Sequence, residues 1–316
     1  MDTDRTLELP ESRWIDLRGP VHYLEWPGPT DAPPFVCLHG LGGSLLNWAL
    51  VAPGLSERAR VLAVDLAGFG LTPPAGRRTG VGANWRLLDE FLCEMEVGPA
   101  ILVGNSMGGM IAMIEAAHAP ERVHALVLAD AVFPRTTRLD GQFRPRTSAL
   151  FAIYNSRRLG LQFLNRIAAR LGPEGLVREA LRVSAADPGS IDPRLVQAIV
   201  ELTATRNAFE HAGPAFIEAA QSIFQAQVRP ARFRALVRAI PTPALVVHGA
   251  LDQLVPVGAA VAAAESHQNW KLVIFDDLGH VPQMEAPERF LDAVRGWLDD
   301  YVPAALRSDA SDSSIA

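Results

Sequence analysis

A short motif around Ser106 is the first place where this sequence could do chemistry. The motif G-N-S-M-G-G over residues 104–109 directly follows an apolar run and opens a helical run over 107–119. A G-x-S-x-G motif between a strand and a helix is typical of a nucleophile elbow. Its turn is so sharp that it strains the serine backbone and leaves no room for side chains at Gly104 and Gly108. We therefore predict a serine hydroxyl held above a sheet edge, at a helix N-terminus that favours negative charge.

A serine hydroxyl becomes a nucleophile when a base takes its proton and a carboxylate orients that base. Among the eight histidines, His280 is the best placed, because it lies on a loop after the last apolar run and can reach back over the sheet edge. Two carboxylates could orient it. Asp252 follows the apolar run 244–247 in a G-A-L-D turn, the more typical arrangement, whereas Asp130 follows the preceding run. The predicted catalytic residues are Ser106, His280 and Asp252, with Asp130 as the alternative acid.

A second glycine-rich turn is predicted to bind the negative charge that forms during the reaction. The motif H-G-L-G-G-S over residues 39–44 follows another apolar run and can bring a backbone N–H close to the serine. The amides of Leu41 and Met107 are the predicted oxyanion hole, with His39 and Gly40 supporting the turn. The motif lacks the Lys-Ser/Thr of a P-loop and the spacing of a dinucleotide fingerprint. We therefore expect no cofactor, and no residue cluster in the sequence indicates a metal.

Alternating strands and helices must hold these residues in place. Continuous apolar runs of four to seven residues predict strands buried on both faces, and amphipathic patterns between them predict helices. This alternation predicts an α/β fold with a mostly parallel eight-stranded sheet and helices on both faces. The expected strands are 14–17, 21–26, 34–38, 61–64, 100–103, 123–129, 244–247 and 272–275, and the expected helices are 83–96, 106–119, 257–265 and 287–301.

The segment from 134 to 240 departs from this alternation. It contains no strand-like run and reads as several helices broken at positions such as Gly172-Pro173. A helical block that interrupts an α/β sheet is the pattern of an inserted cap. The predicted domains are a core formed by 1–133 and 241–303, a helical cap at 134–240 and a disordered tail at 304–316.

Charge is distributed unevenly between these parts. Residues 134–240 contain 16 arginines and 8 acidic residues, a net charge of +8, although the whole chain carries −6. Two interpretations are open. The arginines are solvated helix faces encoded by a GC-rich gene, or they attract an anionic substrate or an anionic lipid surface. The overall negative charge argues against a nucleic-acid binder, so the expected partner is a small ester or acyl substrate. The sequence carries no signal about oligomeric state.

The compartment is predicted from what the sequence lacks. The N-terminus has no apolar segment of a signal peptide, and no stretch approaches 18 uninterrupted apolar residues. Cys37 and Cys93 lie in apolar runs outside any C-x-x-C or Cys/His cluster, so we expect buried free thiols. These features predict a cytoplasmic protein without stable membrane insertion.

Taken together, the motifs resemble the α/β-hydrolase fold superfamily. The resemblance covers residues 12–302 and rests on the order Ser106, Asp252, His280, the H-G-x-G-G turn, the D-x-x-G-x-G turn at 65–70 and the helical insertion. It implies a serine triad and hydrolysis through an acyl-enzyme. Dehalogenases and epoxide hydrolases of the superfamily carry aspartate where this chain has serine, so the resemblance does not imply their chemistry.

The reaction has several candidates within this superfamily. The G-N-S-M-G-G elbow is similar to that of meta-cleavage-product C–C hydrolases, but Val281 stands where those enzymes usually carry tryptophan. The H-V-P-Q-M-E loop over 280–285 is more similar to esterases and monoacylglycerol-lipase-like enzymes. We therefore rank carboxylic-ester hydrolysis first, C–C hydrolysis of a dienone acid second and haloperoxidase-like perhydrolysis third. A ligand-binding homologue that turns over slowly is the alternative from a different class.

Overall fold

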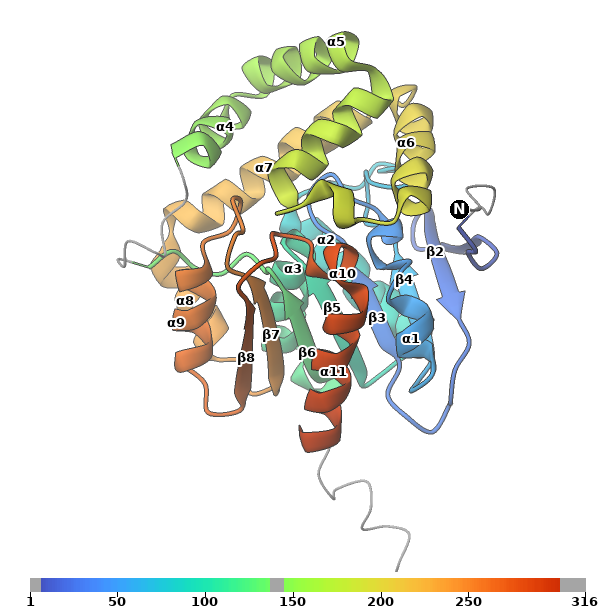
Figure 1. Ribbon diagram of the computed structural model, residues 1–316, viewed down its shortest axis with the longest axis vertical. Helices are drawn as coiled ribbons and strands as arrows, with labels where there is room; N and C mark the ends of the chain where they lie inside the picture. Colours follow the sequence, from blue (N-terminus) through green and yellow to red (C-terminus); the bar gives the residue numbers. More distant parts are fainter. Residues whose placement is uncertain (1–6, 137–144, 302–316) are drawn as a thin grey trace, which may run out of the picture.

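An eight-stranded sheet lies at the centre of the computed structural model, which describes residues 7–136 and 145–301 (Figure 1). Its strand order is β1-β2-β4-β3-β5-β6-β7-β8. The pairs β1–β2 and β2–β4 are antiparallel and the remaining pairs are parallel. The predicted mostly parallel sheet is therefore confirmed. The strands are β1 (Arg13–Asp16), β2 (Pro20–Trp26), β3 (Phe35–Leu38), β4 (Val61–Val64), β5 (Ala100–Asn105), β6 (Val123–Ala129), β7 (Ala244–Gly249) and β8 (Trp270–Phe275).

The central strands are continuous apolar runs because both faces of the sheet are covered. Successive side chains of a strand point to opposite faces. In β4, Leu62 and Val64 belong to one hydrophobic cluster and Val61 and Ala63 to the other. Each face thus has its own core, and an alternating apolar and polar pattern would have left one face in water.

Helices cover both faces. Phe91 of α2, Ile111 of α3 and Ala260 of α9 are buried in one cluster, whereas Leu55 of α1 and Trp297 of α11 are buried in the other. The helices outside the insertion are α1 (Ala52–Ser56), α2 (Val81–Glu94), α3 (Met107–His118), α9 (Val257–Glu265), α10 (Pro282–Glu285) and α11 (Pro287–Tyr301), with 3-10 turns η1 (Leu45–Trp48) and η2 (Pro120–Arg122).

The helical insertion lies between β6 and β7, as expected. Figure 1 shows α4 to α7 above one edge of the sheet. The predicted break at Gly172-Pro173 is present inside α5, where Gly172 has a φ of 63°, and Asp192 caps α6 by accepting from the Arg194 amide. The elements are α4 (Pro145–Asn155), α5 (Arg157–Ser184), η4 (Pro188–Ser190), α6 (Pro193–Asn207), α7 (Ala212–Val228) and α8 (Pro230–Arg238). The domain bounds at 134 and 240 stay a prediction, and the tail at 304–316 lies outside the described residues.

The two cysteines differ in their surroundings. Cys37 is buried in β3, as predicted, but Cys93 is exposed, so the prediction for Cys93 was wrong. The buried stripe of α2 passes through Leu88, Phe91 and Leu92, and the helical period turns the next residue outward. Among the described residues, no helix combines the length and apolar composition needed to cross a bilayer.

Candidate active site

Ser106 occupies the junction between β5 and α3 in a strained conformation. Its φ is 55° and its ψ is −115°, which is left-handed backbone for a residue other than glycine. Strain of this kind is found at functional sites and persists because the surrounding structure imposes it. Here the amide of Ser106 donates to Ala129 O, and its carbonyl accepts from Met110 and Val132. The predicted elbow is therefore held from β6 on one side and from α3 on the other.

The glycines of the elbow are required by close approach of the backbone. A Cβ on Gly104 would lie 2.5 Å from the Gly109 nitrogen, and one on Gly108 would lie 2.2 Å from the Leu38 oxygen. Both separations are far below van der Waals contact. The sequence prediction that no side chain fits at these two positions agrees with this geometry.

His280 and Asp252 are joined by a short hydrogen bond. Nδ1 of His280 lies 2.7 Å from Oδ2 of Asp252, and both residues are buried. Because a carboxylate only accepts, Nδ1 carries the proton and Nε2 is left with the lone pair. Asp252 Oδ1 also accepts from the amides of Leu254 and Val255, at 2.7 and 3.0 Å. Burial opposes ionisation of Asp252, but its interactions with His280 and its backbone hydrogen bonds act in the opposite direction, and together they lower the pKa of Asp252.

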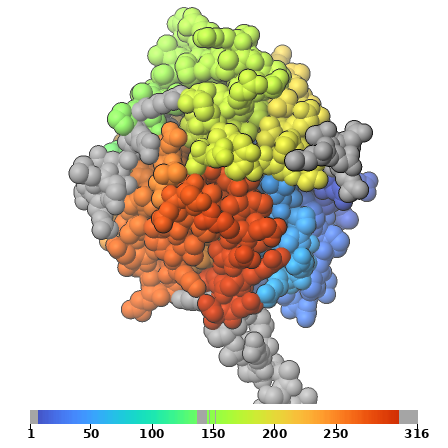
Figure 2. Space-filling view, in the orientation of Figure 1, coloured from blue at the N-terminus to red at the C-terminus, as the bar shows by residue number. Residues whose placement is uncertain are grey.

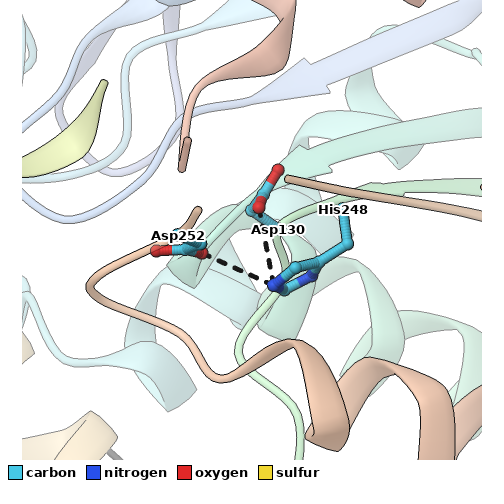
Figure 3. A group of neighbouring side chains, drawn as sticks. All are labelled: Asp130, His248 and Asp252. Atoms are coloured by element: carbon cyan, nitrogen blue, oxygen red, sulfur yellow. Dashed lines mark ion pairs between the residues drawn. The ribbon is translucent and has the colours of Figure 1, made fainter. Parts of the chain in front are cut away.

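Asp130, the alternative acid, lies beside Asp252 instead of replacing it (Figure 3). Its Oδ1 accepts from the Gly249 amide at 3.0 Å, and its Oδ2 has no partner among the described residues. Burial and the negative charge of Asp252 raise the pKa of Asp130 well above its ordinary value. The neutral form of Asp130 is therefore favoured beside Asp252, because two adjacent buried carboxylates would repel each other.

His248 completes this buried cluster, as Figure 3 shows. Its Nε2 lies 3.2 Å from Val255 O, 3.5 Å from Asp130 Oδ1 and 3.6 Å from Asp252 Oδ2. Since all three neighbours are oxygens that accept, Nε2 carries the proton. Burial lowers the pKa of His248, so the ring is a neutral donor toward the two acids.

These three side chains are also the group, among the described residues, whose geometry could hold a metal ion. Their ligand atoms lie within 4.8 Å of one another. However, the Asp252 oxygen already accepts from His280, and the His248 nitrogen already donates to Val255 O. These hydrogen bonds therefore already occupy the atoms of Asp252 and His248 that a metal ion would need.

The glycine-rich turn after β3 lies directly beside Ser106. A Cβ on Gly40 would be 3.0 Å from the Cβ of Ser106. His39 fixes this turn: its Nε2 accepts from the Leu66 amide at 3.1 Å and its Nδ1 donates to Gly40 O at 2.8 Å. Burial lowers the pKa of His39 to about 4. A neutral histidine with this tautomer holds the turn through two hydrogen bonds, and its role beside an oxyanion hole stays a prediction.

Three further residues were not identified as site residues from the sequence. Asn105 donates from Nδ2 to His280 O at 2.9 Å and so ties the elbow to the histidine loop. Arg206 of α6 reaches the turn oxygens Gly42 O and Gly68 O at 3.4 and 3.3 Å. Glu285 accepts from amides on both the histidine loop and the insertion. Each of the three makes at least one contact with a residue distant in sequence, so only the position of Asn105 beside the serine was a usable signal.

Comparison with known proteins agrees with this architecture. Residues 33–287 match the alpha/beta hydrolase fold family. The chain is 31% identical to 2-hydroxymuconate semialdehyde hydrolase of Pseudomonas sp. (strain CF600), over 86% of this chain and 89% of that relative. It is 30% identical to pimeloyl-(acyl-carrier protein) methyl ester esterase of Nitrosomonas europaea, over 83% of this chain and 94% of that relative. The solved structure of a membrane phospholipase A is similar with a TM-score of 0.74 at 25% identity, covering 93% of this chain and 87% of that one. This chain belongs to the α/β-hydrolase fold family.

Proposed function

We propose that this α/β hydrolase cleaves a carboxylic ester through an acyl-enzyme on Ser106. The observation that carries the proposal is the hydrogen bond of 2.7 Å between Asp252 and His280, on the same sheet edge as a serine in a strained elbow. A strained serine, a histidine of defined tautomer and a buried carboxylate are the parts of a serine triad. Cleavage of an ester requires these parts and an oxyanion hole.

The reaction proceeds in two halves. The Ser106 Oγ attacks the carbonyl carbon while its proton passes to Nε2 of His280, and Asp252 stabilises the imidazolium. The C–O bond of the ester then breaks, and the alcohol leaves with that proton. Water attacks the acyl-enzyme by the same route, giving its proton to His280 and releasing the acid and free Ser106.

Two backbone amides bind the oxyanion in this proposal. Met107 is the first residue of α3, so its N–H has no acceptor within the helix. Gly40 O accepts from His39 Nδ1 and from the Gly43 amide. Because a trans peptide holds its N–H opposite its carbonyl, this arrangement directs the Leu41 N–H away from His39. Leu41 and Met107 are therefore the donors that we assign to the hole.

A second candidate is C–C hydrolysis of an anionic dienone acid. It is favoured by Arg206, whose guanidinium lies beside the Gly42 end of the oxyanion turn and pairs with no carboxylate among the described residues. Burial lowers the pKa of Arg206, so a carboxylate that neutralised it there would be well bound. The name of the relative from Pseudomonas sp. (strain CF600), 2-hydroxymuconate semialdehyde hydrolase, is consistent with this second candidate.

A substrate panel separates the two candidates. A chain-length series of p-nitrophenyl esters is assayed beside a dienone acid, with wild type, Ser106→Ala and Arg206→Gln. The proposal predicts ester turnover that falls roughly 10³-fold or more in Ser106→Ala and changes little in Arg206→Gln for a neutral ester. Turnover of the dienone acid alone, lost in Arg206→Gln, would favour the second candidate. A chain that turned over neither class, or gave at most one slow turnover as a ligand-binding homologue would, contradicts the proposal.

A further inference from the structure

Glu285 joins two parts of the molecule that both lie over the active site. Its Oε1 accepts from the Gly279 amide at 3.0 Å, next to His280. Its Oε2 accepts from the amides of Ala186 and Asp187, at 2.7 and 3.4 Å, in the connection after α5. One carboxylate therefore binds amides from the histidine loop and from the helical insertion at the same time.

The backbones of these two parts also touch directly. The His280 amide donates to Ser184 O at 2.6 Å. A Cβ on Gly279 would lie 2.6 Å from both the Ala186 nitrogen and the Ser184 oxygen, so only glycine permits this approach. In Figure 2 the yellow-green surface of the insertion rests directly on the orange-red surface of the C-terminal elements.

We propose that Glu285 is a positioning residue that locks the insertion at residues 184–187 onto the His280 loop. The lock fixes the backbone of the histidine and the height of the insertion over the acyl group. This inference rests on the proposed function, because it concerns acyl groups delivered to Ser106. Long acyl chains would contact the insertion and short ones would not. The inference therefore predicts that kcat/KM for long-chain esters depends on Glu285 more than kcat/KM for short-chain esters.

The carboxylate is chemically suited to this role. The atoms that face it are backbone N–H groups, which only donate, and the Val281 amide also stabilises its charged form. Burial raises the pKa of Glu285, and these amides act in the opposite direction. A glutamine in its place would turn an NH₂ group toward one set of amides, so it could satisfy one side of the lock but not both.

The test combines kinetics with hydrogen exchange of Glu285→Gln. We expect kcat/KM for a long-chain ester to fall about 10-fold, and for an acetate ester to change less than threefold, because misplacement matters most where the insertion holds the substrate. Because glutamine can accept on only one side, at least one of the two sets of amides that donate to Glu285, Gly279 on the one side or Ala186 and Asp187 on the other, should exchange about 10-fold faster or more. Glu288→Gln, an exposed site in the first turn of α11, is the matched control and should equal wild type.

A second variant approaches the lock from the insertion. Ala186→Pro removes the donor of the 2.7 Å bond and places the ring Cδ where that N–H met Glu285 Oε2, so it breaks the lock at the insertion. Ala185, with φ −94° and ψ 148°, is compatible with a following proline. Ala186→Pro should reproduce the acyl-length dependence of Glu285→Gln. Equal losses for short and long esters in both variants, or unchanged exchange of the Gly279, Ala186 and Asp187 amides in Glu285→Gln, would overturn the proposal. Exchange is measured without substrate, so absence of wild-type turnover would contradict the proposed function and leave the lock testable.

Discussion

Two adjacent carboxyl groups at the sheet edge carry different charges because their surroundings differ. Asp252 accepts from His280 and from two backbone amides. Asp130 accepts from one amide and is fully buried beside that negative charge. The charged form of Asp252 is thus stabilised and the neutral form of Asp130 is favoured.

This difference predicts unequal effects of two asparagine substitutions. Asp252→Asn removes the charge that holds the His280 tautomer, so kcat should fall about 10³-fold or more. Asp130→Asn replaces a carboxyl group whose neutral form is favoured by a neutral amide that can still accept from Gly249, so we expect a loss of less than about tenfold. Steady-state ester hydrolysis by both variants measures this, with thermal unfolding as the check on folding. The reverse order would assign the acid to Asp130.

A second Ser-His-Asp group shows that residue types alone do not make a site. His22 Nδ1 lies 2.7 Å from Asp65 Oδ2, and its Nε2 lies 3.0 Å from Ser12 Oγ. However, Ser12 is exposed in the segment before β1, outside any elbow. Asp65 also accepts from the amides of Leu45 and Leu71 and holds a turn together. We therefore interpret this group as structural.

The sequence predicts the triad better than its environment, for a physical reason. Ser106, His280 and Asp252 stand in local motifs whose turns are specified by neighbouring residues. The neutral state of Asp130 depends on the pairing of β6 with β7, in which Ala129 lies opposite Val247. Glu285 accepts a hydrogen bond from the Ala186 amide, which lies 99 residues away in the sequence. Local patterns cannot encode such contacts, so sequence reasoning did not identify them.

At the scale of elements, α3 connects the elbow to a buried titratable group. The helix begins after Ser106 and carries Glu115 near its other end. Glu115 is fully buried, accepts from Trp85 Nε1 at 2.7 Å through Oε2, and its Oε1 has no partner among the described residues. Burial raises the pKa of Glu115 from 4.5 to about 7.

This shift predicts that stability depends on pH through α3. A carboxyl whose pKa is raised in the folded state stabilises it below the unfolded pKa, and that contribution is lost as pH rises through about 7. Glu115→Gln keeps an acceptor for Trp85 and removes the titration. Between pH 5.5 and 8.5 we expect the wild type to lose stability relative to this variant, by about 2 kcal/mol at most.

Urea unfolding midpoints at the two pH values measure this difference. Glu94→Gln, at an exposed position at the end of α2, is the control and should follow the wild type. If the midpoints of wild type and Glu115→Gln shift in parallel, Glu115 does not titrate in this range. The strands and long helices were predictable because their apolar periods are strong, whereas this titration was not, since it depends on packing between α2 and α3.

At the scale of the whole molecule, the charges of the insertion fall into two groups. Arg178, Arg182 and Arg194 pair with acidic neighbours on their own segments. Between residues 157 and 238, seven others are exposed and have no carboxylate partner among the described residues: Arg157, Arg158, Arg166, Arg170, Arg229, Arg232 and Arg238. Only the unpaired group can give the insertion a positive field over the site.

If this field steers an anionic substrate, the effect should weaken with salt. The Debye length shortens from about 30 Å at 0.01 M to about 8 Å at 0.15 M. We expect kcat/KM for a carboxylate-bearing ester to fall as salt rises, while a neutral ester of equal size is unaffected. Replacing Arg157 and Arg158 by glutamine should reduce that salt dependence. Parallel salt profiles for both esters would favour the interpretation of solvated surface arginines.

Covalent labelling of Ser106 tests the central claim most directly. The chain is incubated with an alkyl fluorophosphonate, which reacts with activated serines, and the modified residue is located by mass spectrometry of its peptides. The account predicts one phosphonyl group per chain, on the peptide that contains residues 104–109, and none on folded Ser106→Ala. A label on Ser12, beside the other Ser-His-Asp group, or an unlabelled wild type would contradict it.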